Sequence, residues 1–277
     1  MRQAFEGGHT QSWHAIEARG RVPARTSDVP QYVEHAPHDS PDAVFGVYAP
    51  DLTAWVGSGT KVMSLPYFFD FLMIPPEAIR GVTVCYPTEY ARALHKGHDG
   101  PVTGTPIREH LNGPSSRRPL HVCFTMKRGV PERWRHSIRG RWWYFEHMLR
   151  ERHWAAENHL RFVIKTRRKH RDPWWLRMLG PVVNDDGAMC PDVSQWLLRD
   201  ATAMAHFHSG AVVEAVIQDV PVIRYVRPER MHLDWLAAEC QPPTEFYRPE
   251  LIGRDEYLRR FVGPADASAR ILEVALG

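Results

Sequence analysis

The chain has 277 residues, of which 43% are hydrophobic and 24% are charged. This is the usage of an ordinary globular protein, so disorder is excluded as a description of the whole chain. The most apolar stretch, residues 62–74, contains Asp70 and runs into two prolines. It is far shorter than the ~20 residues that a membrane-spanning helix needs.

The four cysteines are Cys85, Cys123, Cys190 and Cys240, and successive ones lie at least 38 residues apart. Because no pair has CxxC spacing, the sequence does not predict a structural zinc site. Scattered thiols are typical of reduced intracellular proteins, and no apolar signal segment opens the sequence. We therefore expect a cytoplasmic protein.

The formal net charge is only +3, but the charges are unevenly placed. Residues 117–180 hold 17 Lys and Arg against 5 Asp and Glu, so the rest of the chain is net acidic. A segregated basic block favours an anionic partner: a nucleotide diphosphate, a lipid phosphate surface or a nucleic acid. A lipid partner would place the protein at the periphery of a membrane. A solvated, arginine-rich face is the alternative.

In the first part of the chain, short β-rich runs alternate with helical patterns. Strands are predicted at 43–48, 61–65, 81–85 and 101–103, and helices at 52–56 and 89–96. This alternation is typical of βαβ units and a parallel sheet. The pattern stops at residues 112–116, where small and turn-forming residues predict a linker.

Beyond the linker the same alternation restarts. Strands are predicted at 120–125, 160–165, 201–206 and 221–225, and helices at 142–154, 193–199, 211–218, 254–261 and 265–276. The simplest architecture is therefore α/β, with two halves joined by a short hinge at residues 112–117.

The clearest motif is the turn His208-Ser209-Gly210, where a predicted strand ends and a helix begins at once. The first N–H groups of a helix are unpaired and the dipole there is positive, so such a turn can hold a phosphate. Ser209 can cap the helix or donate to the phosphate, and Gly210 lets an anion approach the backbone. We expect Glu214 on the exposed face of the helix, where it could accept hydrogen bonds from a ribose. An ordinary strand–helix junction with a serine cap is the alternative.

This turn, its Glu-bearing helix and the strand Pro221-Val222-Ile223 resemble the C-terminal domain of GT-B-type glycosyltransferases. Relatives of that superfamily include the CDP-glycerol glycerophosphotransferases and the non-hydrolysing UDP-GlcNAc 2-epimerases. The resemblance implies that His208, Ser209, Gly210 and Glu214 bind the nucleotide diphosphate of an activated donor. Residues 227–230 are similar to a segment of the epimerases, although the order of the residues differs.

Three further segments are similar to elements of the same superfamily. The segment 102–106 looks like the turn that closes the N-terminal domain, which implies that Gly104 and Thr105 line the donor site. The segment 162–170 resembles a strand end that carries a Lys followed by His-Pro. Lys165 aligns with that Lys, and Arg168 adds a cation for the diphosphate, but the His-Pro pair is missing here.

The third segment is the loop after a short N-terminal strand, where Gly7-Gly8-His9 looks like the opening loop of these transferases. The resemblance implies that Gly8 faces the diphosphate and that His9 faces the acceptor. A His with a pKa near neutrality suits the general base that takes the acceptor proton. We therefore predict His9 as the catalytic base, with Asp70 as the second choice.

Taken together, the resemblance implies two Rossmann-like domains that face each other across a cleft. Residues 1–114 would form an abbreviated acceptor-side domain, and residues 115–277 would form the domain that binds the donor nucleotide. The implied activity is metal-independent transfer of a glycosyl or polyol-phosphate group from a nucleotide-diphosphate donor. The donor is a substrate, so no cofactor is expected.

Two other functions stay open. A nucleotide-sugar 2-epimerase would use the same fold with carboxylates and a His in the cleft, and Asp70, Glu89 and His208 could supply some of them. A non-catalytic relative could bind an anionic polymer through residues 117–180. For a transferase the acceptor is also open: a lipid phosphate, an anionic polymer or a base of modified DNA. A metal pair at Asp185-Asp186, as in GT-A enzymes, is less expected than a turn.

Overall fold

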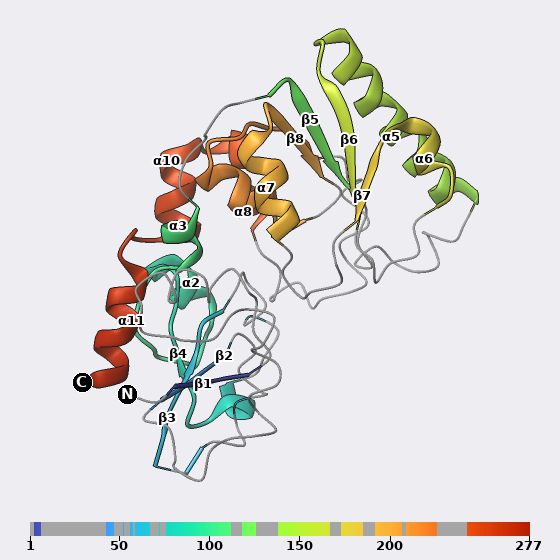
Figure 1. The fold of residues 1–277 in the computed structure, drawn as a ribbon. Coiled ribbons are helices and arrows are strands. Elements are labelled where there is room, and N and C mark those ends of the chain that lie inside the picture. Colours follow the sequence, from blue (N-terminus) through green and yellow to red (C-terminus); the bar gives the residue numbers. More distant parts are fainter. Residues whose placement is uncertain are drawn as a thin grey trace. The chain divides into compact units, whose positions relative to one another are not determined.

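A computed structural model describes residues 3–6, 43–46, 52, 56–57, 59–66, 72, 76–111, 118–125, 138–166, 173–184, 192–206, 209–225 and 243–277. The chain divides into two compact units (Figure 1). The first unit comprises residues 1–112 and 255–277, and the second comprises residues 113–254.

The sheet of the first unit is parallel, and its strands follow one another in chain order. They are β1 (Gln3–Glu6), β2 (Ala43–Gly46), β3 (Lys61–Ser64) and β4 (Thr83–Val84). All three pairings between neighbouring strands are parallel. Beyond β4, Tyr86 and Val102 form one isolated parallel bridge, which is all that the structure shows of the strand predicted at 101–103.

Short helices follow these strands in the first unit. They are η5 (Pro76–Ile79), α2 (Glu89–Leu94) and α3 (Ile107–His110). Helix α2 begins at Thr88, whose hydroxyl oxygen accepts from the Ala91 N–H at 3.1 Å and so satisfies one unpaired N–H of the first turn.

The C-terminal segment completes the first unit, not the second. It contains α10 (Arg254–Tyr257), the π-helical turn η9 (Leu258–Val262) and α11 (Ala267–Leu276). Ile271 and Ala275 of α11 are buried in one cluster with Phe45 of β2 and Met63 of β3. The sequence analysis assigned residues 255–277 to the second domain. They lie with the first because the apolar face of α11 covers the apolar residues of β2 and β3.

The second unit has a parallel sheet in which the strand order reverses. Its strands are β5 (Leu120–Phe124), β6 (Arg161–Thr166), β7 (Val182–Asn184), β8 (Ala203–His206) and β9 (Val222–Tyr225). The spatial order is β7-β6-β5-β8-β9. The chain therefore builds outward from β5 to β7 and then returns to the other side of β5 with β8. This is the order of a Rossmann-like, doubly wound sheet.

Helices cover both faces of this second sheet (Figure 1). Helix α5 (Ile138–Glu157) packs against β5, β6 and the short α6 (Leu176–Leu179). Helix α7 (Asp192–Asp200) packs against β5 and α8 (Val212–Ile217). The short helices α9 (Thr244–Tyr247) and η8 (Pro249–Leu251) complete the unit. The predicted α/β class is confirmed in both units.

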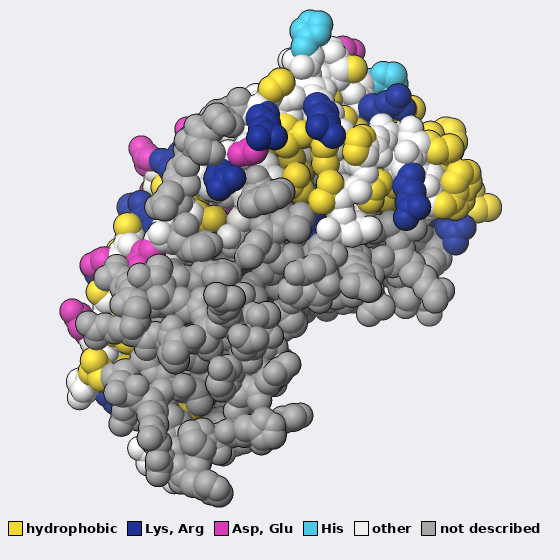
Figure 2. Space-filling model, viewed as in Figure 1, with side chains coloured by type: hydrophobic (Ala, Val, Ile, Leu, Met, Phe, Trp, Pro, Cys, Tyr) yellow, Lys and Arg dark blue, Asp and Glu magenta, His cyan; other side chains and the backbone are white. Residues whose placement is uncertain are grey.

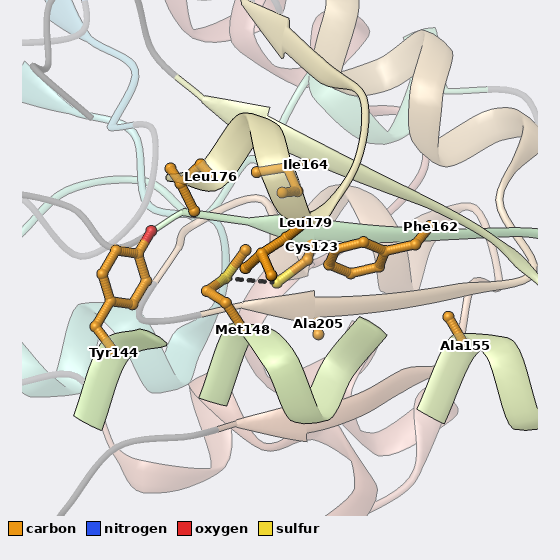
Figure 3. Packing of buried hydrophobic residues seen from close by; sticks show 9 residues of the cluster. All are labelled: Cys123, Tyr144, Met148, Ala155, Phe162, Ile164, Leu176, Leu179 and Ala205. Atoms are coloured by element: carbon orange, nitrogen blue, oxygen red, sulfur yellow. Dashed lines mark hydrogen bonds between the residues drawn. The ribbon is translucent and has the colours of Figure 1, made fainter. Parts of the chain in front are cut away.

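Under α5 lies a core of buried apolar side chains (Figure 3). Its buried members are Cys123, Tyr144, Met148, Ala155, Phe162, Ile164, Leu176, Leu179 and Ala205. Beside this core, His121 Nε2 lies 3.1 Å from Glu151 Oε2, and both side chains are buried. His121 is the second residue of β5 and is distant from the carboxyl end of the strand, so this pair belongs to the core.

Most predicted elements agree with the structure to within a few residues. The helix predicted at 142–154 is longer, because α5 runs for 20 residues from Ile138 to Glu157. The sequence analysis missed the short elements α3, α6, β7 and α9, which have three or four residues each. None of the helices in the described part of the chain is long and apolar enough to cross a membrane.

Candidate functional site

The strand order of the second unit identifies the carboxyl ends of β5 and β8 as the candidate site. In open α/β sheets, ligands bind outside the carboxyl ends of the strands at the point where the strand order reverses. In this sheet that point lies between β5 and β8, which pair in parallel with His206 opposite Phe124.

Three residues lie in one row at this edge of the sheet. Phe124, near the end of β5, pairs with Lys165 of β6 on one side and with His206 of β8 on the other. Residues in register on parallel neighbours project from the same face, so the Lys165 and His206 side chains flank Phe124 at about 10 Å from each other. Lys165 is 3% exposed, and its Nζ donates to the Thr166 carbonyl at 2.5 Å. The Lys165 amino group is thus buried at the carboxyl edge.

His206 connects the strand end to the turn that follows. Its Nδ1 accepts from the Ser209 N–H at 3.0 Å, and its Nε2 lies 3.2 Å from the Tyr247 carbonyl oxygen. A backbone N–H can only donate, so Nδ1 carries no proton and Nε2–H donates to the carbonyl. The imidazole is therefore neutral, with its tautomer set by two backbone groups. The sequence analysis missed this residue, although a His that ends a buried strand directly before a turn is a visible signal.

Ser209 has a defined role in the turn. Its Oγ accepts from the Ala211 N–H at 3.2 Å, and the residue is 4% exposed. This bond lies within the turn, because α8 begins at Val212 and its N-cap residue, Ala211, receives no side-chain cap; the expected cap by Ser209 is therefore not what the structure shows. The hydroxyl proton is still able to donate to a ligand, because a serine hydroxyl both donates and accepts. Gly210 is also buried, beside Ser209.

Glu214 is buried, and the expectation of an exposed position is wrong. It is 2% exposed, and all six residues of α8 are buried. The helix is enclosed because it packs on α7 and β9, and Arg254 donates to the carbonyls of Val216 and Ile217 at 3.1 and 3.2 Å. Burying a carboxylate costs free energy unless it is hydrogen-bonded or paired. Glu214 is the one polar residue of α8, and it lies in the first turn of the helix.

Gly104 and Thr105 lie in the first unit, where their neighbours explain the turn. Gly104 has φ +88°, and a Cβ at this position would lie 2.9 Å from the carbonyl oxygen of Pro264. The Thr105 N–H donates to the Val262 carbonyl at 3.1 Å. The glycine is therefore required by a left-handed backbone and by close packing against the C-terminal segment. Neither feature needs a donor ligand.

Beside this turn the first unit has an open pocket of about 690 Å³. Its lining includes Tyr90, Val102, Arg108, Arg259 and Arg260. The Arg260 guanidinium lies 4.1 Å from the centre of the Tyr90 ring. Arg108 donates to the carbonyl of Gly263, a neutral acceptor. The pocket follows the carboxyl end of β4, and cations are present in its wall.

Arg259 is paired within this pocket and so contributes less free charge. Its guanidinium donates to both carboxylate oxygens of Glu256 at 2.7 Å. This hydrogen bond lowers the pKa of the exposed Glu256 carboxyl below its usual value. Arg108 and Arg260 are the other two cations of the wall.

The remaining predicted site residues lie outside the described residues. They are Gly8, His9, Asp70, Arg168 and His208, and the pair Asp185-Asp186 lies there too. Strand β1, which precedes Gly7, is at the edge of its sheet and pairs with β2. The strand-order rule therefore does not single out the loop that contains His9. Among the described residues, no three His, Cys, Asp or Glu side chains are grouped so that they could hold a metal ion.

No family model matches this sequence, and no curated protein is significantly similar to it. The assignment of a function therefore depends on the fold of each unit, the residues at the carboxyl edge of the second sheet and the sequence motifs.

Proposed function

We propose that the protein is a GT-B-type transferase that binds a nucleotide-diphosphate-activated donor in its second unit. The observation that carries this proposal is the row Lys165–Phe124–His206 beside the Ser209-Gly210 turn, at the reversal of a doubly wound sheet. Ligands of such sheets bind at this place. The motif resemblance of the turn and of the Lys165 strand supports the same assignment.

The donor diphosphate is held by groups of different kinds. Lys165 supplies a positive charge, Ser209 supplies a hydroxyl proton, and Gly210 has no side chain to block approach to the backbone. Arg168 and His208 follow the ends of β6 and β8 in the sequence and would add charge and hydrogen bonds.

The transfer step needs a nucleophile, a base and a stabilised leaving group. An acceptor hydroxyl attacks the anomeric carbon of a sugar donor, or the transferred phosphorus of a polyol-phosphate donor. The bond to the nucleotide leaving group breaks as the new bond forms, and the base takes the hydroxyl proton. Lys165 and Arg168 stabilise the charge that develops on the leaving group, which is why the proposal includes no metal. His9 is the proposed base, with Asp70 second.

The acceptor belongs to the first unit in this proposal, with the two units facing each other across a cleft. The pocket beside Tyr90 supports an acceptor that carries an anionic group, because its wall has three arginines (Arg108, Arg259 and Arg260) against two carboxylates, Glu89 and Glu256. Lipid phosphates, anionic polymers and modified DNA all have such a group.

The test is a thermal-shift and calorimetry screen of nucleoside diphosphates and nucleotide sugars. A ligand present at 100 times its dissociation constant stabilises the fold by about 2.7 kcal/mol, so a true donor raises the melting temperature measurably. Lys165→Met keeps the length of the buried side chain, and we expect its affinity for that nucleotide to fall at least tenfold. The matched control is the exposed Lys96→Met, which should bind like the wild type.

If no nucleotide stabilises the protein, the donor assignment is wrong. Assays with the donor that binds then separate the reactions. Transfer to an acceptor supports the proposal. Isomerisation of a nucleotide sugar in the absence of an acceptor would identify a 2-epimerase, and binding without turnover would identify a binding protein.

A further inference from the structure

Large hydrophobic side chains are unusually exposed at one end of the second unit. Ile138 and Trp142 of α5 are 89% and 66% exposed, and Trp174 and Met178 at α6 are 77% and 59% exposed. We call these four residues the tryptophan surface. Figure 2 shows hydrophobic side chains gathered where Figure 1 has α6, with Lys or Arg side chains beside them.

The two helices that carry the tryptophan surface pack against each other. The Trp175 ring lies 5.3 Å from Tyr144 and 5.2 Å from Phe145, between ring centres. Phe145 in turn lies 5.9 Å from Trp142. Ile138 is one helical turn from Trp142, on the same side of α5. The exposed side chains thus lie on or beside two helices that pack together through aromatic rings.

Three arginines accompany this surface. Arg139 and Arg141 on α5 and Arg177 on α6 are exposed. Among the described residues, no carboxylate lies within ion-pair distance of any of the three, and the nearby Glu146 pairs with Arg150 at 2.5 Å. Within the described part of the chain, the surface therefore combines bulky apolar side chains with arginines that have no carboxylate partner.

This combination fits the interface of an anionic lipid bilayer. Tryptophan rings lie at the level of lipid headgroups, and arginines extend to the phosphates while their stems stay in contact with the apolar layer. Ile138 and Met178 distinguish a bilayer from a nucleic acid, because aliphatic side chains enter the acyl layer but do not stack on bases. Anionic lipids in turn attract the three arginines.

The position of the tryptophan surface relative to the second sheet indicates which edge of that sheet would face a membrane. Helix α5 has 20 residues and is about 30 Å long, whereas β5 and β6 are about 20 Å or less. Since α5 ends just before β6 begins, its first turns extend past the carboxyl edge of the sheet. We propose that the tryptophan surface docks the protein on an anionic membrane, with the carboxyl edge of the second sheet toward the lipid. Docking does not depend on the proposed transferase activity.

The experiment is co-sedimentation of the full chain with vesicles of phosphatidylcholine alone and of phosphatidylcholine with 30% phosphatidylglycerol. We expect strong binding to the anionic vesicles, weakened by salt. In Trp142→Ser/Trp174→Ser the partition coefficient should fall at least tenfold on both compositions. In Arg139→Gln/Arg141→Gln/Arg177→Gln it should fall on the anionic vesicles only. The control Leu251→Ser/Leu276→Ser removes two other exposed side chains and should bind like the wild type.

Several results would overturn the proposal. They are the absence of wild-type binding to either vesicle, equal binding by the Trp double variant, and a dimer that the double variant alone converts to monomer. Tighter binding of a single-stranded oligonucleotide through the same tryptophans would assign the surface to nucleic acid instead. If the double variant does not fold, quenching of wild-type tryptophan fluorescence by brominated lipids decides the question. The nucleotide thermal shift of the folded variants is measured in parallel, so failure of docking and failure of the donor site are separate outcomes.

Discussion

The two sheets of this protein are both parallel, yet the chain builds them in different ways. In the first sheet each new strand is added at the same edge, in the order β1-β2-β3-β4. In the second sheet the chain returns to the other side of β5, in the order β7-β6-β5-β8-β9. A return of this kind separates the connections that follow the neighbouring strands β5 and β8 at the carboxyl edge, which is where α/β sheets bind ligands. The candidate site therefore belongs to the second unit.

The first sheet has a different consequence. Its apolar residues are covered by a segment from far along the chain. Helix α11 packs on the residues of β2 and β3. The two sheets thus teach that strand order indicates where a ligand binds, whereas the cover of a sheet can come from a segment that is distant in the sequence.

The largest expected effect is a loss of stability of the first unit when the packing of α11 on its sheet is weakened. Ile271 on α11 is 0% exposed, and Ile271→Ala should lower the stability of the first unit by about 2–5 kcal/mol. Hydrogen exchange measures the two units separately, and amides of the second sheet should keep their protection. Leu276→Ala on the same helix is the control, because Leu276 is 56% exposed and its change should be within about 0.5 kcal/mol. Equal loss of protection in both sheets would contradict the division into units.

The next prediction tests the site at the reversal of the second sheet. His206→Phe keeps a ring of similar size but leaves the Ser209 N–H and the Tyr247 carbonyl without their partner. We expect a loss of stability of about 1–3 kcal/mol and a loss of donor affinity of tenfold or more. Calorimetry with the nucleotide found in the screen measures the affinity. His206→Gln, which can still accept and donate, should recover part of both. If the Phe variant binds the donor normally, His206 does not organise the turn.

A smaller effect distinguishes structural glycines from ligand-binding ones. Gly104→Ala introduces a Cβ at φ +88° and 2.9 Å from Pro264, so the first unit should lose about 1–2 kcal/mol. Gly59→Ala is the matched control, since Gly59 has φ +82° and nothing within 4 Å of the added Cβ. Its loss should be smaller, because only the backbone is strained. Nucleotide affinity is measured on both variants, and a selective loss in Gly104→Ala would return that residue to the donor site.

The smallest effect compares one thiol from each unit. Burial raises the pKa of Cys85 to about 12, and burial together with the Glu151 carboxylate raises the pKa of Cys123. Both should stay unlabelled by a thiol reagent at pH 8 in the native protein and react on denaturation, as mass spectrometry of peptides would show. Rapid native labelling of either would show that its unit opens.

The same thiols make stability depend on pH in a defined direction. The folded pKa values lie above the unfolded value of about 8.5, so the contribution to stability is complete below that pH. It is lost progressively as the pH rises toward the folded pKa. Replacing Cys85 by Ser should remove part of this slope in urea-unfolding series between pH 8 and pH 10.

The sequence by itself determined most of the longer strands and helices and the position of the linker, but not the shortest elements. Buried apolar runs such as 120–125 are local signals, and one boundary between the units falls at Asn112, inside the predicted linker. Only the tertiary structure decided the order of the strands, the partner of α11 and the burial of Glu214. These depend on contacts between residues far apart in the chain. A local pattern records that a face is apolar, but it does not record which other face covers it.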